Sequence, residues 1–459
     1  MTGVKSAVEK LYPVVPFILA NTITFIPYLV FLTMHTGDNL ESVLPFVLFY
    51  TVRMTGIFLL KSFRFGLTTL HIFILSLLAG GIGSFFGILG AWWQPCYFVS
   101  AVLIGLSAAW LPPTNTTIKY QRKEAGVEKE KVGLLDLLFL LLLLGIFIAA
   151  LAIDFPAKNI VIFTEYTLLY LVAVRKMSSY PLQERRMTKM DEQTFFMKEF
   201  LLFLTYFILL IIVRLARALF DSHYLTVAVI SFSACLIVAA WYLSVAHRSW
   251  RLPIWLNILA FINGMCTNYI LLFGTFYTAF NFGNDRITFY LYVPYIFGLI
   301  ASKLLIKYVY RLFPKMDKEL IHIFGLILSL LLLMFQPIFP VGVFVFSLFI
   351  SGTSSYLNRV FAESEELPKD QRVIIRYSIQ SKGSITHQFL MITGLWIMAK
   401  SSGVSINTVL QITGHKEATP QILQMIDVIH YLSIGILLYL LFFVLYERLF
   451  KDRKPPIEN

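Results

Sequence analysis

Long apolar runs, separated by short segments rich in charged residues, proline, glycine or asparagine, cover most of the chain. A helix needs about 20 apolar residues to cross the hydrocarbon core of a bilayer, and most of these runs reach that length. The pattern predicts an all-α integral membrane protein with 14 transmembrane helices. The predicted spans are 11–33, 43–60, 67–90, 94–112, 133–153, 158–174, 198–220, 223–245, 253–280, 287–306, 319–335, 337–357, 384–400 and 426–447.

Two of the divisions between spans rest on short breaks. Trp92–Pro95 separates the third span from the fourth, and Gln336–Pro337 separates the eleventh from the twelfth. Without these breaks each pair would form one run of about 40 apolar residues, which is too long for a single helix across a core of about 30 Å. We therefore expect the chain to turn at both places.

The composition and the charge distribution agree with a membrane protein. Hydrophobic residues make up 58% of the 459 residues and charged residues 14%, whereas a soluble domain carries roughly 25% charged residues. The net charge is +12, and with the N-terminus inside the cell most of the 38 lysines and arginines lie on the inner side. This bias predicts a multi-pass protein of the cell (plasma or inner) membrane with both termini in the cytoplasm.

The signals of a soluble enzyme do not occur in the sequence. There is no phosphate-binding loop, no Gly-rich dinucleotide turn and no Cys/His metal spacing. Cys96, Cys235 and Cys266 all lie in apolar runs and favour neither a disulfide framework nor a metal site. We therefore predict no enzyme activity, no cofactor, no metal and no nucleic-acid partner.

An internal repeat relates the two ends of the chain. Gly56 and Lys61 recur as Gly298 and Lys303 at an offset of 242 residues, and Asn21 recurs as Asn263 at the same offset. Repeats of this kind build the two gating halves of transporters. The repeat predicts a six-helix bundle over 1–175, a cytoplasmic linker with two extra helices over 176–252, and a second six-helix bundle over 253–459.

The repeated residues match part of a known motif. Gly56 and Lys61, and again Gly298 and Lys303, stand where a Gly-x-x-x-Asp-Arg-x-Gly motif has its first glycine and its basic residue. Leu60 and Ser302 replace the acid of that motif, and Phe63 replaces its second glycine. The stretch 376–388 looks like an Arg-x(n)-Gly-Gly-Ser stretch. By these features the sequence resembles the major facilitator superfamily, in its fourteen-span, drug-exporter-like form.

The resemblance implies a transporter with two six-helix bundles, and it has one clear departure. The antiporter motif Gly-x-x-x-Gly-Pro of the family is missing from 133–153, which contains only Gly145. The missing motif and the missing acid differ from the pattern of a standard proton-driven exporter.

Polar side chains deep in a span are expensive and usually functional. Glu165 lies near the middle of 158–174, where a carboxylate can bind a proton or a cation, or can pair with Arg53. Arg53 can hold an anionic substrate, pair with Glu165, or extend its side chain to the membrane surface. Asn21, Asn263 and Asn268 lie in the first spans of the two bundles, where they contact substrate or bond neighbouring helices.

Residues at the predicted cytoplasmic ends of spans are candidates for gating. They are Gly56, Lys61, Arg64, Gly298 and Lys303. The alternative for Lys61, Arg64 and Lys303 is that their positive charges only set the topology. We interpret most other polar residues in the spans as structural, and histidine can in addition relay protons. They are Arg214 and Arg217 in the two extra spans, and His387, Gln388, Asp427 and His430 near the C-terminus.

These features favour an ion-coupled secondary transporter that exports a small lipophilic or amphipathic solute by alternating access, as an efflux antiporter. The expected partners are this solute or a lipid, proton or sodium as the coupling ion, and membrane lipids. A flippase for a lipid or a lipid-linked sugar is the alternative, with Arg53 holding the anionic headgroup. A membrane enzyme is disfavoured, because the outer loops are short except for 401–425.

Overall fold

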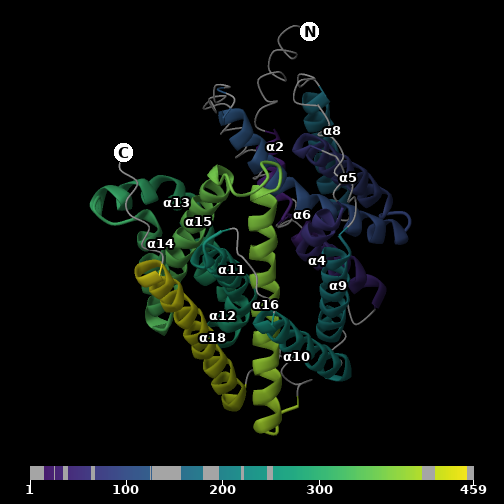
Figure 1. Ribbon diagram of the computed structural model, residues 1–459. Coiled ribbons are helices and arrows are strands. Elements are labelled where there is room, and N and C mark those ends of the chain that lie inside the picture. Colours follow the sequence, from purple (N-terminus) through teal and green to yellow (C-terminus); the bar gives the residue numbers. More distant parts are fainter. Residues whose placement is uncertain are drawn as a thin grey trace. The chain divides into compact units, whose positions relative to one another are not determined.

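The computed structural model describes residues 15–24, 26–34, 40–63, 68–124, 126, 157–178, 196–218, 222–245, 252–405 and 419–451, and every regular element in these ranges is helical (Figure 1). The chain divides into two compact units, 1–219 and 220–459, called unit 1 and unit 2. The helices of unit 1 are α2 (Val15–Thr22), α3 (Ile26–Thr33), α4 (Leu40–Ser62), α5 (Thr69–Leu89), α6 (Pro95–Glu124), α8 (Lys158–Ser178) and α9 (Met197–Ala218).

Unit 2 contains π-helical segments between its α-helices. Its elements are α10 (Ser222–Val245), α11 (Ile254–Asn268), the π-helix η2 (Tyr269–Phe273), α12 (Gly274–Phe282), η3 (Asn284–Arg286), η4 (Thr288–Tyr292), α13 (Val293–Leu312), α14 (Lys318–Leu333), η5 (Gln336–Ile338), α15 (Phe339–Glu363), α16 (Arg372–Ser401), α18 (Pro420–Tyr446) and η6 (Glu447–Lys451). The first predicted span of each bundle is interrupted, between α2 and α3 in unit 1 and at η2 in unit 2.

The described helices coincide with the predicted spans. Each predicted span overlaps a described helix except 133–153, which lies outside the described residues. Seven of the described helical segments are long and apolar enough to cross a membrane, which is the property of a multi-pass membrane protein. The count of fourteen spans stays a prediction. Both expected turns are confirmed, because α5 ends at Leu89 before Pro95 and α14 ends at Leu333 before η5.

Two helices extend well beyond the spans predicted for them. The span predicted over 94–112 lies in α6, which ends at Glu124, and the span predicted to begin at residue 384 lies in α16, which begins at Arg372. Charged residues in 372–383 suggested a cytoplasmic loop, but Arg372 and Arg376 are buried and donate hydrogen bonds to protein oxygens. A buried arginine with oxygen acceptors is compatible with a helix inside the protein.

Glycines set the closest helix contacts. Gly80 of α5 leaves room for the ring of Tyr170 of α8, whose hydroxyl bonds Ser107 of α6 at 3.0 Å. In unit 2, a Cβ on Gly264 of α11 would overlap the backbone carbonyl of Gln380, and one on Gly383 would overlap that of Phe261. Close packing of helices at glycines therefore occurs in both units.

The same helix neighbours recur in both units. In unit 1, α4 packs on α6, α5 packs on α6 and α8, and α2 contacts α6 and α8. In unit 2, α13 packs on α15, α14 packs on α15 and α18, and α11 contacts α15 and α18. This correspondence supports the internal repeat inferred from the sequence.

The boundary between the units falls inside the predicted linker segment 176–252. Helix α9 packs along α4 in unit 1, whereas α10 packs on α16 in unit 2. In α10, Phe232 stacks on Phe389 with ring centroids 4.0 Å apart, and Thr226 accepts a hydrogen bond from Trp396. The predicted domain limits at 175 and 253 stay predictions. Helix α9 belongs to unit 1 and α10 to unit 2.

Candidate functional site

Glu165 is held in α8 with a buried carboxyl group. Both carboxylate oxygens are buried, and neither has a hydrogen-bond partner among the described residues. The neighbouring Tyr166 is fully buried, whereas Val161 and Leu168 on the adjoining face are exposed. Glu165 thus lies at the edge between the packed face and the exposed face of α8. Its predicted place inside the membrane stays a prediction.

Arg53 lies on α4 and is half-buried. Its guanidinium carbon is 5.7 Å from the centre of the Tyr50 ring, which is one turn earlier on the same helix. No ion pair joins Arg53 to Glu165 in the part of the chain that the structure describes. The two candidate residues of unit 1 are therefore separate features.

Lys61 has a partner that the sequence did not indicate. Its ammonium group forms an ion pair with Glu199 at 2.9 Å, which joins the end of α4 to the start of α9. The backbone N–H of Phe196 also donates to the carbonyl of Ser62 at 2.8 Å. Lys61 therefore fixes α9 to α4.

The two motif glycines occupy equivalent positions. Gly56 of α4 faces α6, where Trp110 donates to its carbonyl oxygen at 2.8 Å and Ala109 leaves no space for a side chain. Gly298 of α13 faces α15, and a Cβ there would overlap Ser347. Both glycines allow close helix contact within a unit.

Three further predicted site residues are Lys303, Asn21 and Arg64. Lys303 is exposed on α13. Asn21 lies in α2, but its side chain is outside the described part. Arg64 lies outside the described residues. Their predicted roles stay predictions.

Asn263 belongs to a buried polar cluster with Arg376. Its amide nitrogen donates to the carbonyl of Ile350 at 3.0 Å, and its oxygen accepts from Arg376 at 3.2 Å. Arg376 also donates to Ser354 at 2.7 Å and is fully buried. The cluster joins α11, α15 and α16. The only sequence signal for it was the apolar flank of Arg376 at Val373–Ile375, which suits a helix better than a loop.

Asn268 and Tyr269 stand where α11 passes into the π-helix η2, and they contact two buried histidines. Asn268 lies 3.1 Å from Nδ1 of His387, and the hydroxyl of Tyr269 lies 2.9 Å from Nδ1 of His430. Nε2 of His430 is 3.0 Å from the carbonyl oxygen of Leu333. Because a carbonyl only accepts, this nitrogen carries the proton, and in a neutral ring Nδ1 then accepts from Tyr269. The hydrogen bonds agree with the packing role predicted for both histidines.

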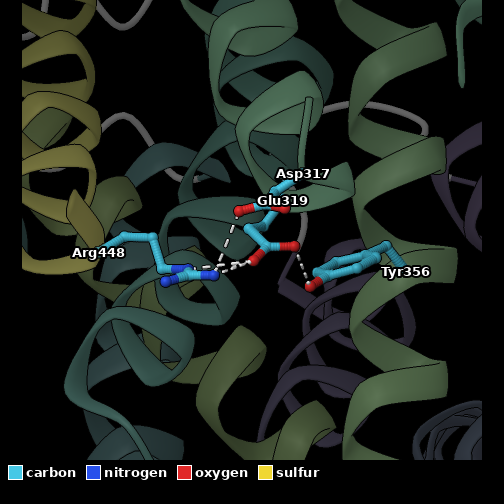
Figure 2. Close-up of polar contacts among 4 residues, drawn as sticks. All are labelled: Asp317, Glu319, Tyr356 and Arg448. Carbon is cyan, nitrogen blue, oxygen red and sulfur yellow. Dashed lines mark hydrogen bonds and ion pairs between the residues drawn. The ribbon is translucent and has the colours of Figure 1, made fainter. Parts of the chain in front are cut away.

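A second charged cluster lies at one end of unit 2 (Figure 2). Arg448 donates to Glu319 through Nε at 3.0 Å and Nη2 at 2.7 Å, and Asp317 lies 3.4 Å from Nη2. The hydroxyl of Tyr356 donates to the other oxygen of Glu319 at 3.0 Å. These charge-assisted bonds hold the start of α14 to α15 and to η6, which follows α18.

An open groove of about 800 Å³ lies between α11, α16 and α18 in unit 2. Its lining is almost entirely apolar and includes Phe261, Met265, Leu390, Tyr431 and Tyr439. Gly435 contributes to its width, since a Cβ there would meet nothing within 4 Å. The groove suits apolar matter rather than a polar solute.

The comparisons with known proteins identify the fold. No protein-family model matches the sequence, and no curated protein matches it. An auto-inhibited peptide transporter of the POT family matches over 98% of both chains, with a TM-score of 0.52 and 12% identity. The major facilitator superfamily transporter FucP, solved in the outward conformation, matches over 95% of this chain and 98% of its own, with a TM-score of 0.44 and 12% identity.

The chain therefore shares the fold of the POT family peptide transporter. This likeness to a transporter structure agrees with the resemblance drawn from the sequence. The likeness concerns the fold, and the POT family structure is named as a peptide transporter. The flippase alternative has no support from it.

Proposed function

We propose that the chain is an ion-coupled secondary transporter that moves a small lipophilic or amphipathic solute by alternating access. The observation that carries the proposal is Glu165, whose carboxylate oxygens are buried in a helix of a transporter fold without a hydrogen-bond partner in the described part. An isolated charge in a membrane interior is unfavourable, so this carboxyl group favours binding of a proton or a cation. Binding and release there would couple the ion to the movement of the solute.

The nature of the solute follows from the surfaces that unit 2 offers. The groove between α11, α16 and α18 is lined by apolar and aromatic side chains, which suit a lipophilic molecule. The outward direction of transport rests on the resemblance of residues 376–388 to drug exporters. Proton is our first choice for the coupling ion, because Glu165 belongs to no cluster of three or more acidic, histidine or cysteine side chains among the described residues.

The test uses the purified full chain in liposomes that contain a pH-sensitive dye. Lipophilic cations such as tetraphenylphosphonium and anionic amphiphiles such as oleate are added in turn, with and without a sodium gradient. We expect solute-dependent proton movement in the wild type and its loss in Glu165→Gln, which keeps the size of the side chain. Wild-type proton movement in Glu165→Gln would remove Glu165 from the mechanism.

Glu366→Gln is the matched control, since Glu366 is an exposed acid outside the helices. It should leave proton movement unchanged. Solute movement that follows sodium instead of protons would contradict the proposed ion. An absence of movement for every solute tested would contradict the proposed lipophilic substrate class.

A further inference from the structure

Three arginines are buried in the described part of the chain, and one of them differs from the others. Arg372 donates to the carbonyls of Leu367 and Ala362 at 3.0 and 2.8 Å. Arg376 donates to Asn263 and Ser354 through Nη2, although its Nε and Nη1 are buried without an acceptor among the residues described. Arg214 is only 4% exposed, but Nε and Nη2 of its guanidinium are buried and donate to no acceptor among the residues described.

The position of Arg214 makes this arrangement costly. It lies on the face of α9 that packs against α4, next to Leu210 and Val213, which are fully buried. Its guanidinium carbon is 3.6 Å from the centre of the Tyr50 ring. Tyr50 precedes Lys61 by eleven residues, or about 16 Å along α4, which places this contact near the middle of the span.

Protein contacts balance only part of this cost. A cation over an aromatic ring contributes about 2 kcal/mol when desolvated, whereas burial of a charge without an ion partner costs several kcal/mol. Arg53 brings a second guanidinium to the same ring, with its carbon 5.7 Å from the centre. Arg214, which forms no ion pair among the described residues, favours an anion as a further partner.

Aromatic side chains adjoin the two arginines. Phe46 lies one turn before Tyr50 on α4, and its ring centre is 6.0 Å from the Arg214 guanidinium carbon. Tyr28 of α3 contacts both Phe46 and Tyr50, with ring centroids 5.2 and 6.2 Å away. The surroundings thus place a positive charge beside apolar aromatic side chains, which suits a molecule with an anionic head and an apolar body.

We propose that Arg214, Arg53 and Tyr50 form an anion-binding site in unit 1 that takes the carboxylate or phosphate head of an amphipathic molecule, with Phe46 and Tyr28 against its apolar part. The proposal narrows the substrate of the proposed transporter to anionic amphipathic molecules. Only the transport of the bound molecule rests on the proposed function; its binding does not. The same head group occurs on anionic membrane lipids and on soluble amphiphiles.

The site is tested by equilibrium binding to the full chain in nanodiscs of phosphatidylcholine. The probes are oleate, oleoyl lysophosphatidate and, as the uncharged match, oleyl alcohol. We expect both anions to bind at least about tenfold more tightly than the alcohol, and Arg214→Gln to remove that difference, because charge-assisted hydrogen bonds to the head group are lost. Arg214→Lys should retain part of the affinity, since it keeps the charge but not the planar group.

Arg286→Gln is the matched control. Arg286 also faces a tyrosine, with its carbon 5.5 Å from the Tyr290 ring, but its side chain is 55% exposed. It should leave binding unchanged. Equal binding of oleate and oleyl alcohol to the wild type, or wild-type oleate affinity in Arg214→Gln, overturns the proposal.

Two further measurements, a thermal unfolding assay and a competition with lipid, distinguish the possible outcomes. If Arg214→Gln does not fold, the wild type alone decides, because oleate must raise its unfolding temperature more than oleyl alcohol does. Phosphatidylglycerol added to the nanodiscs identifies the source of the anion: displacement of oleate assigns the site to a membrane lipid, and no displacement assigns it to a soluble amphiphile. Anion binding without transport in liposomes leaves the site standing and contradicts only the proposed function.

Discussion

The two units hold their buried charged groups differently. In unit 2, each buried arginine donates to two protein oxygens, and His430 uses both ring nitrogens between Tyr269 and Leu333. Nε and Nη1 of Arg376 and Nε2 of His387 are nevertheless buried without a hydrogen-bond partner in the described part. In unit 1, Nε and Nη2 of Arg214 and both carboxylate oxygens of Glu165 are buried without a partner there. Buried polar groups are usually hydrogen-bonded, so the two groups of unit 1 are the stronger candidates for contact with a ligand or an ion.

The largest effect should come from the crossing of α11 and α16. Gly264→Ala places a methyl group on the backbone of α16 at Gln380, where no flexible side chain can move away. We expect a loss of about 3 kcal/mol or more in the free energy of unfolding, measured in detergent. Gly435→Ala is the control, since its Cβ has open space around it. Equal stability of the two variants would contradict the described contact.

The next effect separates the arginines of the two units. Arg376→Met leaves the oxygen of Asn263 and the hydroxyl of Ser354 buried without their donor. We expect the unfolding free energy to fall by about 2 to 4 kcal/mol. A thermal unfolding series in detergent, with Lys382→Met as a control on the same helix, measures the change. An unchanged free energy of unfolding would mean that the Arg376 guanidinium makes no net contribution to the stability of unit 2.

The corresponding change in unit 1 should have the opposite sign. Arg214→Met removes a buried cation that lacks a hydrogen-bond acceptor in the described part, and it keeps an apolar contact with Tyr50. We expect the ligand-free protein to gain about 1 kcal/mol or more. The same unfolding assay, run without added amphiphile, checks it. A fall in the free energy of unfolding similar to that of Arg376→Met would contradict the difference described between the two arginines.

The smallest effect concerns the attachment of α9. Lys61 and Glu199 are each about one-fifth exposed and lie 2.9 Å apart. A double-mutant cycle with Lys61→Ala and Glu199→Ala should give a coupling of about 0.5 to 1 kcal/mol, reduced by added salt. A coupling near zero at low salt would show that the remaining contacts, such as that between Phe58 and Tyr206, hold α9 to α4 alone.

The sequence predicted the helical membrane fold because hydrophobic length is a local property that each run carries by itself. It also located the glycines and the buried asparagines that join helices. It missed the ion pair of Lys61 with Glu199 and the burial of Arg376, since these depend on partners 138 and 113 residues away. The charge of Arg376 suggested a loop, because a sequence does not show whether oxygens from other helices surround a cation.

The link between α9 and α10 has a mechanical consequence. Only residues 219–221 separate Ala218, at the end of α9 in unit 1, from Ser222, at the start of α10 in unit 2. A chain of this length spans at most about 14 Å, so these two helix ends stay within that distance in every state of the protein. A tether this short keeps one unit at an effective concentration in the millimolar range around the other.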